Sequence, residues 1–182
     1  MTNTLTIVLG FVFDLLCLLF WLRFLLQASG ADFYNPLSQA VVNASDKVCK
    51  PLRRVLPSIG VFDLASLLVA WLVASIGVAV MIQLIAPGQF PVLAILYRGL
   101  IEALLVLTQF YFFAILIMVL ASFIAPGNYN PALALIQQVL EPLIGPVRRV
   151  LPPLGPIDLS PMVVMLLIVL VQGMLTGATG IR

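Results

Sequence analysis

The chain has 182 residues, of which 63% are hydrophobic and only 9% are charged. Soluble domains carry about 25% charged residues because their surface faces water, so most of this surface must face lipid and we expect an integral membrane protein. A net charge of +2 is too small for a nucleic-acid partner. The sequence contains no histidine, which excludes His-based catalysis, imidazole metal sites and His-ligated haem. Cys17 and Cys49 form no CxxC motif, so we expect neither a metal nor a cofactor.

Four apolar segments are long enough to cross a bilayer. The first, residues 5–26, spans 22 residues and would extend about 33 Å as a helix, against a hydrocarbon core of about 30 Å. Residues 1–4 contain no Lys or Arg, so we expect a retained span and not a signal peptide. The other segments are 64–86, 93–125 and 159–178. The prediction is an all-α membrane protein with four transmembrane helices.

The basic residues indicate how these helices are oriented. With four spans, residues 27–63 and 126–158 lie on one side of the membrane, and that side holds seven of the 9 Lys and Arg residues. These seven are Arg23, Lys47, Lys50, Arg53, Arg54, Arg148 and Arg149. The other side holds Arg98 and Arg182. By the positive-inside rule, the long loops are predicted to be cytoplasmic and both termini to face the outer side of the membrane.

An internal repeat is visible, because residues 34–66 align without a gap on residues 129–161 at an offset of 95. Each copy reads YNP followed by PxRRVLPxxGxxDL. The motif positions are Asn35, Pro36, Arg53, Arg54, Pro57, Gly60 and Asp63 in the first copy, and Asn130, Pro131, Arg148, Arg149, Pro152, Gly155 and Asp158 in the second. The alignment predicts two parallel tandem repeats, 1–92 and 93–182, related by a pseudo-two-fold axis along the membrane normal.

Each copy of the motif predicts a surface helix followed by a turn. Asn can cap a helix N-terminus and Pro suits the first helical position, which predicts helices over 36–49 and 131–144. Their apolar residues recur at helical spacing, so we expect amphipathic helices at the cytoplasmic membrane surface. Pro142 is expected to kink or end the second one early. Basic Pro/Gly turns over 51–63 and 146–158 then lead back into the membrane.

Asp63 and Asp158 stand at the predicted N-termini of the second and fourth spans. A carboxylate there is favoured by capping and by the helix dipole. The spacing from the Arg pair to the Asp is the same in both copies, so we predict that one Arg of each pair reaches its Asp and forms a charge-assisted clamp. Replacing both aspartates with asparagine is then expected to lower stability in detergent and steady-state protein levels.

The doubled motif, flanked by apolar spans, resembles that of the YggT family of bacterial inner-membrane proteins. The second copy has the fuller form, with Ser160 and Pro161 after Asp158-Leu159, where the first copy has Ala65 and Ser66. The resemblance implies a small multi-pass inner-membrane protein. Relatives are linked to osmotic-shock tolerance, cation homeostasis and the cell-division gene neighbourhood, and chloroplast relatives to cytochrome b6 cofactor assembly and to nucleoid or thylakoid organisation. The family has no established reaction, so we expect no enzyme activity.

Polar residues within the spans are a second set of candidates. Asp14 would lie about 14 Å deep, near the bilayer centre, and its equivalent in the second copy is Gln109. They are interpreted either as an ion or proton relay or, favoured here, as an interhelical hydrogen bond or ion pair. Arg98 and Glu102 are four residues apart and are expected to pair, although Arg98 has the alternatives of snorkelling or of reaching Asp14.

Three further patterns have structural explanations. The Arg pairs could recognise lipid headgroups or a protein partner, but their position beside a span is explained first by the positive-inside rule. Trp21 and Trp71 are interpreted as lipid-facing or interfacial packing. Gly173 and Gly177 form a GxxxG match, which is typical of helix association but is also common by chance.

The sequence thus favours a non-enzymatic scaffold or assembly factor of the bacterial inner membrane that acts through its cytoplasmic motif faces. Its expected partners are the lipid bilayer, including anionic phospholipids, and a membrane protein, with homo-oligomerisation as an option. The alternative is a small oligomeric ion channel or transporter for osmotic or cation homeostasis, with Asp14 and Gln109 along its path.

Overall fold

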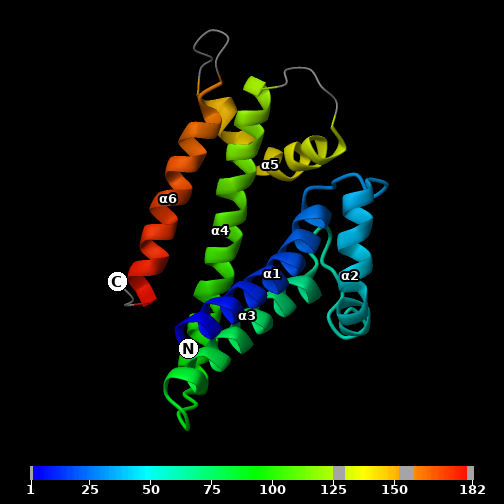
Figure 1. Ribbon diagram of the computed structural model, residues 1–182. Coiled ribbons are helices and arrows are strands. Elements are labelled where there is room, and N and C mark those ends of the chain that lie inside the picture. The colour runs from blue at the N-terminus through cyan, green and yellow to red at the C-terminus, as the bar shows by residue number, and fades with distance from the viewer. Residues whose placement is uncertain (1, 125–129, 152–157, 180–182) are drawn as a thin grey trace.

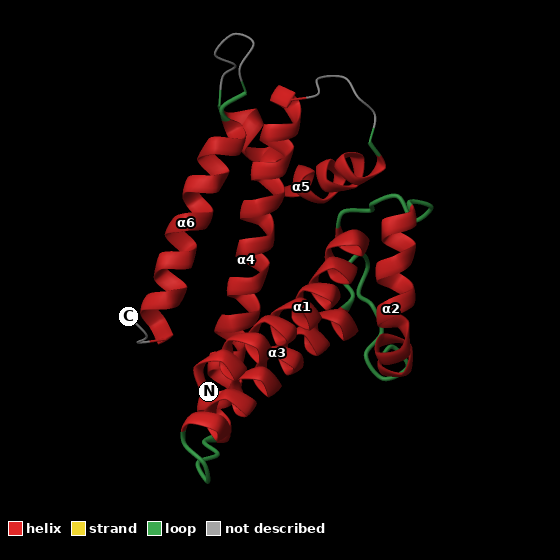
Figure 2. Ribbon diagram, viewed as in Figure 1, coloured by secondary structure: helices red, strands yellow, loops and turns green. Residues whose placement is uncertain are grey.

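The computed structural model describes residues 2–124, 130–151 and 158–179. These residues form helices joined by loops, with no β-sheet among them (Figures 1 and 2). In chain order the helices are α1 (Thr2–Ala28), α2 (Pro36–Leu52), α3 (Leu64–Ile85), α4 (Val92–Ile124), α5 (Pro131–Val150) and α6 (Ser160–Thr179).

Four of these helices, α1, α3, α4 and α6, are long and apolar enough to cross a membrane. Four long apolar helices are thus confirmed at the positions expected from the sequence, with ends that agree within three residues. In Figure 1, both chain ends and the α3–α4 turn lie at one end of the bundle, and α2 and α5 lie toward the other. This arrangement places the two motif copies at the end away from the termini.

The bundle is held by close crossings of α3 with its two neighbours. A Cβ atom added at Gly77 of α3 would lie 3.0 Å from Phe13 of α1, and one added at Gly99 of α4 would lie 2.6 Å from the Cα of Ser75 on α3. The indole nitrogen of Trp71 donates a hydrogen bond to the carbonyl of Leu96 at 3.0 Å, again from α3 to α4. Small residues therefore let these helices approach backbone to backbone.

The interpretation of Trp21 as lipid-facing or interfacial is wrong. Its side chain is only 6% exposed and belongs to a core cluster that also contains Cys17 and Phe20. The indole nitrogen donates a hydrogen bond to the carbonyl of Ala103 at 2.8 Å. This bond satisfies the one polar atom of the ring, so the large apolar side chain can pack between α1 and α4.

The predicted ends of the two shorter helices also need correction. α2 continues to Leu52, beyond the expected end at residue 49, and α5 continues to Val150, beyond the expected end at residue 144. Pro142 therefore does not end α5. An internal proline removes one backbone hydrogen bond, and both Pro142 and Pro146 lie on the exposed side of α5, where solvent can satisfy the freed carbonyl.

Candidate functional site at the ends of α1 and α2

The first copy of the motif forms a buried ion-pair cluster around Asp63. Asp63 immediately precedes α3 and is fully buried. Arg53, just after α2, donates from Nη2 to Oδ2 at 2.5 Å and from Nε to Oδ1 at 3.2 Å. The hydroxyl of Ser66 donates to the same Oδ2 atom. The predicted clamp between Arg and Asp is thus present in this copy, and it joins the end of α2 to the start of α3.

Arg23, near the end of α1, extends this cluster and was not identified as a site residue from the sequence. Its guanidinium group is 3.5 Å from Asp63 and 2.7 Å from Asp46 of α2. It also donates to the carbonyl of Val42 at 3.0 Å and to the hydroxyl of Ser45 at 2.7 Å. Arg23 is only 4% exposed. It therefore connects α1 to α2 and to Asp63, the residue before α3, and it is not an exposed positive charge of the kind that the positive-inside rule describes.

The cluster holds the Asp63 carboxylate in its charged form. Burial raises the pKa of Asp63, but hydrogen bonds from Arg53 and Ser66 and the positive charges of Arg53 and Arg23 outweigh burial and lower that pKa below its ordinary value. The same contact raises the pKa of Arg53. A buried carboxylate needs such partners, because an unpaired buried charge is strongly destabilising. Asp63 makes no side-chain capping hydrogen bond to α3, so the predicted capping role is wrong here.

The second copy of the motif makes the same clamp at an exposed position. Arg148 donates from Nε to Oδ2 of Asp158 at 2.9 Å and also contacts Glu141 at 3.4 Å. Asp158 accepts the backbone N–H of Ser160 at 2.9 Å, as the capping prediction requires. The side chains of Arg148 and Asp158 are 49% and 43% exposed, so water screens this pair in a way that it cannot screen the pair around Asp63.

The Asn-Pro sequences start α2 and α5 as predicted. Asn35 accepts the backbone N–H of Leu37, and Asn130 accepts that of Ala132, each at 2.9 Å. Pro36 and Pro131 occupy the first helical positions. The amide of Asn35 also donates to the carbonyl of Pro131 at 2.8 Å, which links the beginnings of α2 and α5.

The turn after α2 contains the remaining motif residues of the first copy. Gly60 adopts a positive φ of 59°, a conformation that other residues rarely adopt, and Pro57 is exposed in the same turn. The equivalent Pro152 and Gly155 lie outside the described residues.

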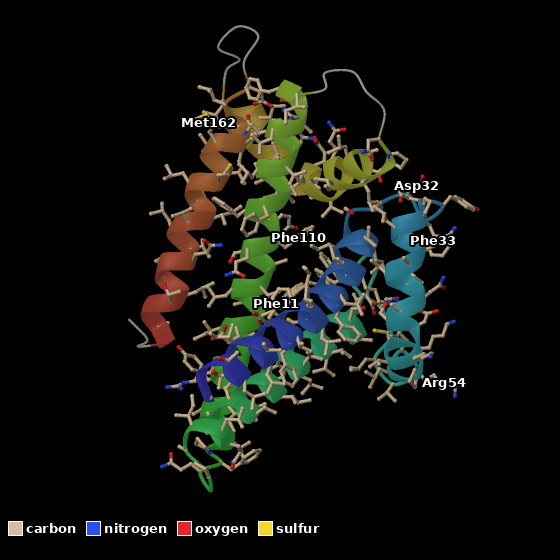
Figure 3. All side chains as sticks on the ribbon, in the orientation of Figure 1. Phe11, Asp32, Phe33, Arg54, Phe110 and Met162 are labelled. Carbon is tan, nitrogen blue, oxygen red and sulfur yellow. The ribbon has the colours of Figure 1, made fainter. Side chains whose placement is uncertain are left out.

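The second Arg of each pair is placed differently from the first. Arg54 and Arg149 are exposed, and among the described residues neither forms an ion pair. Figure 3 shows Arg54 extending outward near the end of α2, at the opposite end of that helix from Phe33. The sequence could not distinguish the two arginines of a pair, because both occupy the same motif.

The polar residues within the spans are only partly brought together. Asp14, Arg98 and Glu102 line one cavity of about 380 Å³ between α1, α3 and α4. Among the ion pairs of the described residues, none joins Arg98 to Glu102 or to Asp14, so the expected pairing is not formed. Gln109 is exposed on α4 and does not line this cavity. Asp14 and Gln109 therefore do not line a common cavity within this chain.

The chain is similar to proteins of a known family. A model of the family described as CCB3/YggT matches residues 2–85 and 97–179. A protein of Pseudomonas aeruginosa, described as uncharacterized, is 40% identical over 87% of this chain and 81% of its own length. The uncharacterized protein YggT of Escherichia coli strain K12 is 37% identical over 93% and 88%. No solved structure matches the chain. The family match across nearly all of the chain, together with these relatives, shows that the protein belongs to the CCB3/YggT family.

Proposed function

We propose that this protein is a non-enzymatic scaffold or assembly factor of the bacterial inner membrane, which recruits a membrane-protein partner to its cytoplasmic face. The observation that carries the proposal is the division of roles within the Arg pairs. Arg53 and Arg148 hold the fold through Asp63 and Asp158, whereas Arg54 and Arg149 are exposed. An exposed Arg at an equivalent position in each copy provides a charged, hydrogen-bonding surface of the kind that is enriched at protein interfaces.

The arrangement of α2 and α5 supports a docking face. Tyr34, Leu37 and Val48, on or beside α2, are exposed, and the hydrogen bond from Asn35 to Pro131 joins the beginnings of α2 and α5. We propose that α2 and α5 are amphipathic helices that lie at the cytoplasmic surface, one in each of two tandem repeats. In this orientation the termini lie in the periplasm. The match of the family model to two successive stretches of the chain is in line with such a duplication.

Site-specific photo-crosslinking in native membranes tests this proposal. A photo-reactive amino acid at Val55 or Val150, the exposed neighbours of Arg54 and Arg149, is expected to capture the same partner protein. A probe at Leu166, which is exposed in the middle of the α6 span, serves as the control and should capture lipid only. The proposal fails if both motif positions capture no protein, or if the Leu166 probe captures the same protein equally well.

The charge of the exposed arginines supplies a second test. With the photo-reactive amino acid at the exposed Val55, Arg54→Glu with Arg149→Glu should reduce the crosslinked partner at least tenfold while the protein level stays unchanged, because neither side chain supports the fold. If the partner links the protein to osmotic stress or to envelope organisation, the same double variant should reproduce the growth defect of a deletion strain after osmotic shock. Unchanged crosslinking would contradict the assignment of these arginines.

A second candidate function is a small ion channel or transporter, and the cavity lined by Asp14, Arg98 and Glu102 favours it. Ionisable residues inside a membrane are costly and are often functional. Purified protein in liposomes distinguishes the two proposals: cation flux that Asp14→Ala abolishes would support transport and defeat the scaffold. Absence of flux in both proteins is the result that the scaffold predicts.

A further inference from the structure

A polar cavity lies beside the ion-pair cluster, between the end of α1 and the beginning of α2. Its volume is about 270 Å³. Arg23 and Gln27 of α1, Ser38 of α2 and Arg53 after α2 contribute the polar part of its wall, while Leu26 and neighbouring side chains contribute an apolar part. Among the described residues that line it there is no carboxylate.

The polar wall consists of groups that can donate hydrogen bonds. Ser38 and Arg23 are only 2% and 4% exposed. The Ser38 hydroxyl has no hydrogen-bond partner among the described residues, whereas the Nε atom of Arg23 lies 3.5 Å from Oδ2 of Asp63. The carbonyl oxygen of Gln27 accepts from Arg53 at 3.1 Å, which leaves the amide nitrogen of Gln27 to donate. Buried polar atoms are normally hydrogen-bonded, so the cavity suits a ligand whose outer atoms are acceptor oxygens.

The charges around the cavity favour an anion. The adjoining cluster contains three cations, Arg23, Lys50 and Arg53, and two carboxylates, Asp46 and Asp63, so it carries one net positive charge. Both carboxylates are engaged by these cations and lie outside the cavity wall. A ligand with a single negative charge would therefore neutralise the cluster.

The position of the cavity limits what that anion can be. Gln27 and Leu26 lie in the last turn of α1, a helix that ends at Ala28 and is long and apolar enough to span a membrane. The last turn of a spanning helix lies near the depth of the lipid headgroups. A phosphate group has acceptor oxygens and negative charge, and Arg is the side chain best suited to bind it. We propose that the cavity binds a phosphate group, supplied either by an anionic phospholipid headgroup or by free phosphate.

The second copy of the motif does not reproduce this site. At the same offset of 95 residues, Arg23 corresponds to Met118, Gln27 to Ser122 and Ser38 to Leu133. Only the clamp arginine is retained, as Arg148. The donors of the cavity are therefore a property of the first copy and not a requirement of the shared motif. This inference does not depend on the scaffold proposal, whose test uses Arg54 and Arg149.

Thermal unfolding of the purified full chain in detergent tests the proposal, with three probes. These are the short-chain lipids dihexanoyl phosphatidylglycerol and dihexanoyl phosphatidylcholine, and inorganic phosphate. Phosphatidylglycerol should raise the unfolding temperature in a saturable way, because a ligand that binds the folded state stabilises it. Phosphatidylcholine, which has no net charge, should raise it much less. An equal effect of inorganic phosphate would identify free phosphate as the source, and no effect of it would identify the lipid headgroup.

Variants at Ser38 show whether the cavity itself is responsible. Ser38→Leu introduces the residue found at the equivalent position 133, fills the cavity, and should weaken phosphatidylglycerol binding at least tenfold. Ser38→Ala removes only the hydroxyl, should weaken binding a few-fold, and keeps the test open if the leucine variant does not fold. Gln39→Leu, at an exposed position next to Ser38, is the control and should bind normally.

Three results would overturn the proposal. One is the absence of a saturable effect from both phosphatidylglycerol and inorganic phosphate. Another is an equal response to phosphatidylglycerol and phosphatidylcholine, which would indicate general detergent or lipid solvation. The third is unchanged binding in the folded Ser38 variants.

Discussion

At the scale of single residues, the same Arg and Asp pair has different surroundings in the two copies of the motif. The Arg-to-Asp spacing was sufficient to predict both pairs. It could not predict the participation of Arg23, because that residue reaches the cluster from another span, or that Asp63 is fully buried while Asp158 is 43% exposed. Burial depends on the packing of α1, α2 and α3 together, and a local motif does not contain that information.

This difference predicts unequal effects of equivalent substitutions. Asp63→Asn leaves Arg23 and Arg53 without their shared carboxylate and should lower the free energy of unfolding by about 3 kcal/mol. Asp158→Asn breaks an exposed pair and should cost about 0–1 kcal/mol. Unfolding titrations in mixed detergent measure both variants against the wild type. Equal losses in the two variants would contradict the role assigned to burial.

The lowered pKa of Asp63 also predicts a dependence of stability on pH. Because the folded-state pKa lies below the unfolded value of about 3.9, the stabilisation is complete above that value and is lost as pH falls through the folded pKa. The wild type should therefore lose stability when the pH is lowered below about 4, and Asp63→Asn should lose less over the same range. Thermal unfolding at a series of pH values tests this, and parallel curves for the two proteins would refute it.

At the scale of elements, apolar length and Asn-Pro sequences were reliable guides. They predicted the four long helices and the starts of α2 and α5, because burial in lipid and capping act locally. They failed where proline was taken to end a helix: α5 continues through Pro142 and Pro146. They also did not predict the close contact between Gly99 and Ser75, because nothing near Gly99 in the sequence indicates that Ser75 lies against it.

Two glycines in the long helices, one closely packed and one in open space, predict different effects of the same substitution on stability. A Cβ atom at Gly99 would lie 2.6 Å from the Cα of Ser75, whereas one at Gly173 would meet nothing within 4 Å. Gly99→Ala should therefore force α3 and α4 apart and destabilise the protein by about 1–3 kcal/mol. Gly173→Ala should change stability by less than about 1 kcal/mol. Unfolding temperatures in detergent distinguish them, and a harmless Gly99→Ala would argue against this helix crossing.

At the scale of the whole molecule, the order and length of the spans were enough to predict which segments share an end of the bundle. The motif-bearing segments lie toward one end, and the α3–α4 turn lies at the other with the termini (Figure 1). The cross-connections at the motif end could not be predicted. Asn35 reaches Pro131, and the backbone N–H of Asp32 reaches Gln138 at 2.9 Å, and these contacts arise only when the two halves of the chain pack together.

Cysteine labelling tests the proposed orientation of the molecule. Cys17 and Cys49 are buried, so background labelling should be low. Tyr34 in the α1–α2 loop and Gln89 in the α3–α4 turn are exposed, and these two connections lie at opposite ends of the bundle (Figure 1). A membrane-impermeant maleimide applied to intact spheroplasts should label Gln89→Cys and not Tyr34→Cys. Inverted membrane vesicles should give the opposite pattern, and the reverse result in either preparation would invert the topology.

The central claim is that adjacent arginines have separate tasks: the first holds the fold, and the second, which is proposed to meet a partner, contributes little to it. Comparing the unfolding free energies of Arg53→Gln and Arg54→Gln in the same detergent tests it most directly. Loss of the clamp should cost Arg53→Gln about 2 kcal/mol or more, while Arg54→Gln should remain within about 0.5 kcal/mol of the wild type. Equal stability of the two variants, or a greater loss in Arg54→Gln, would contradict the claim.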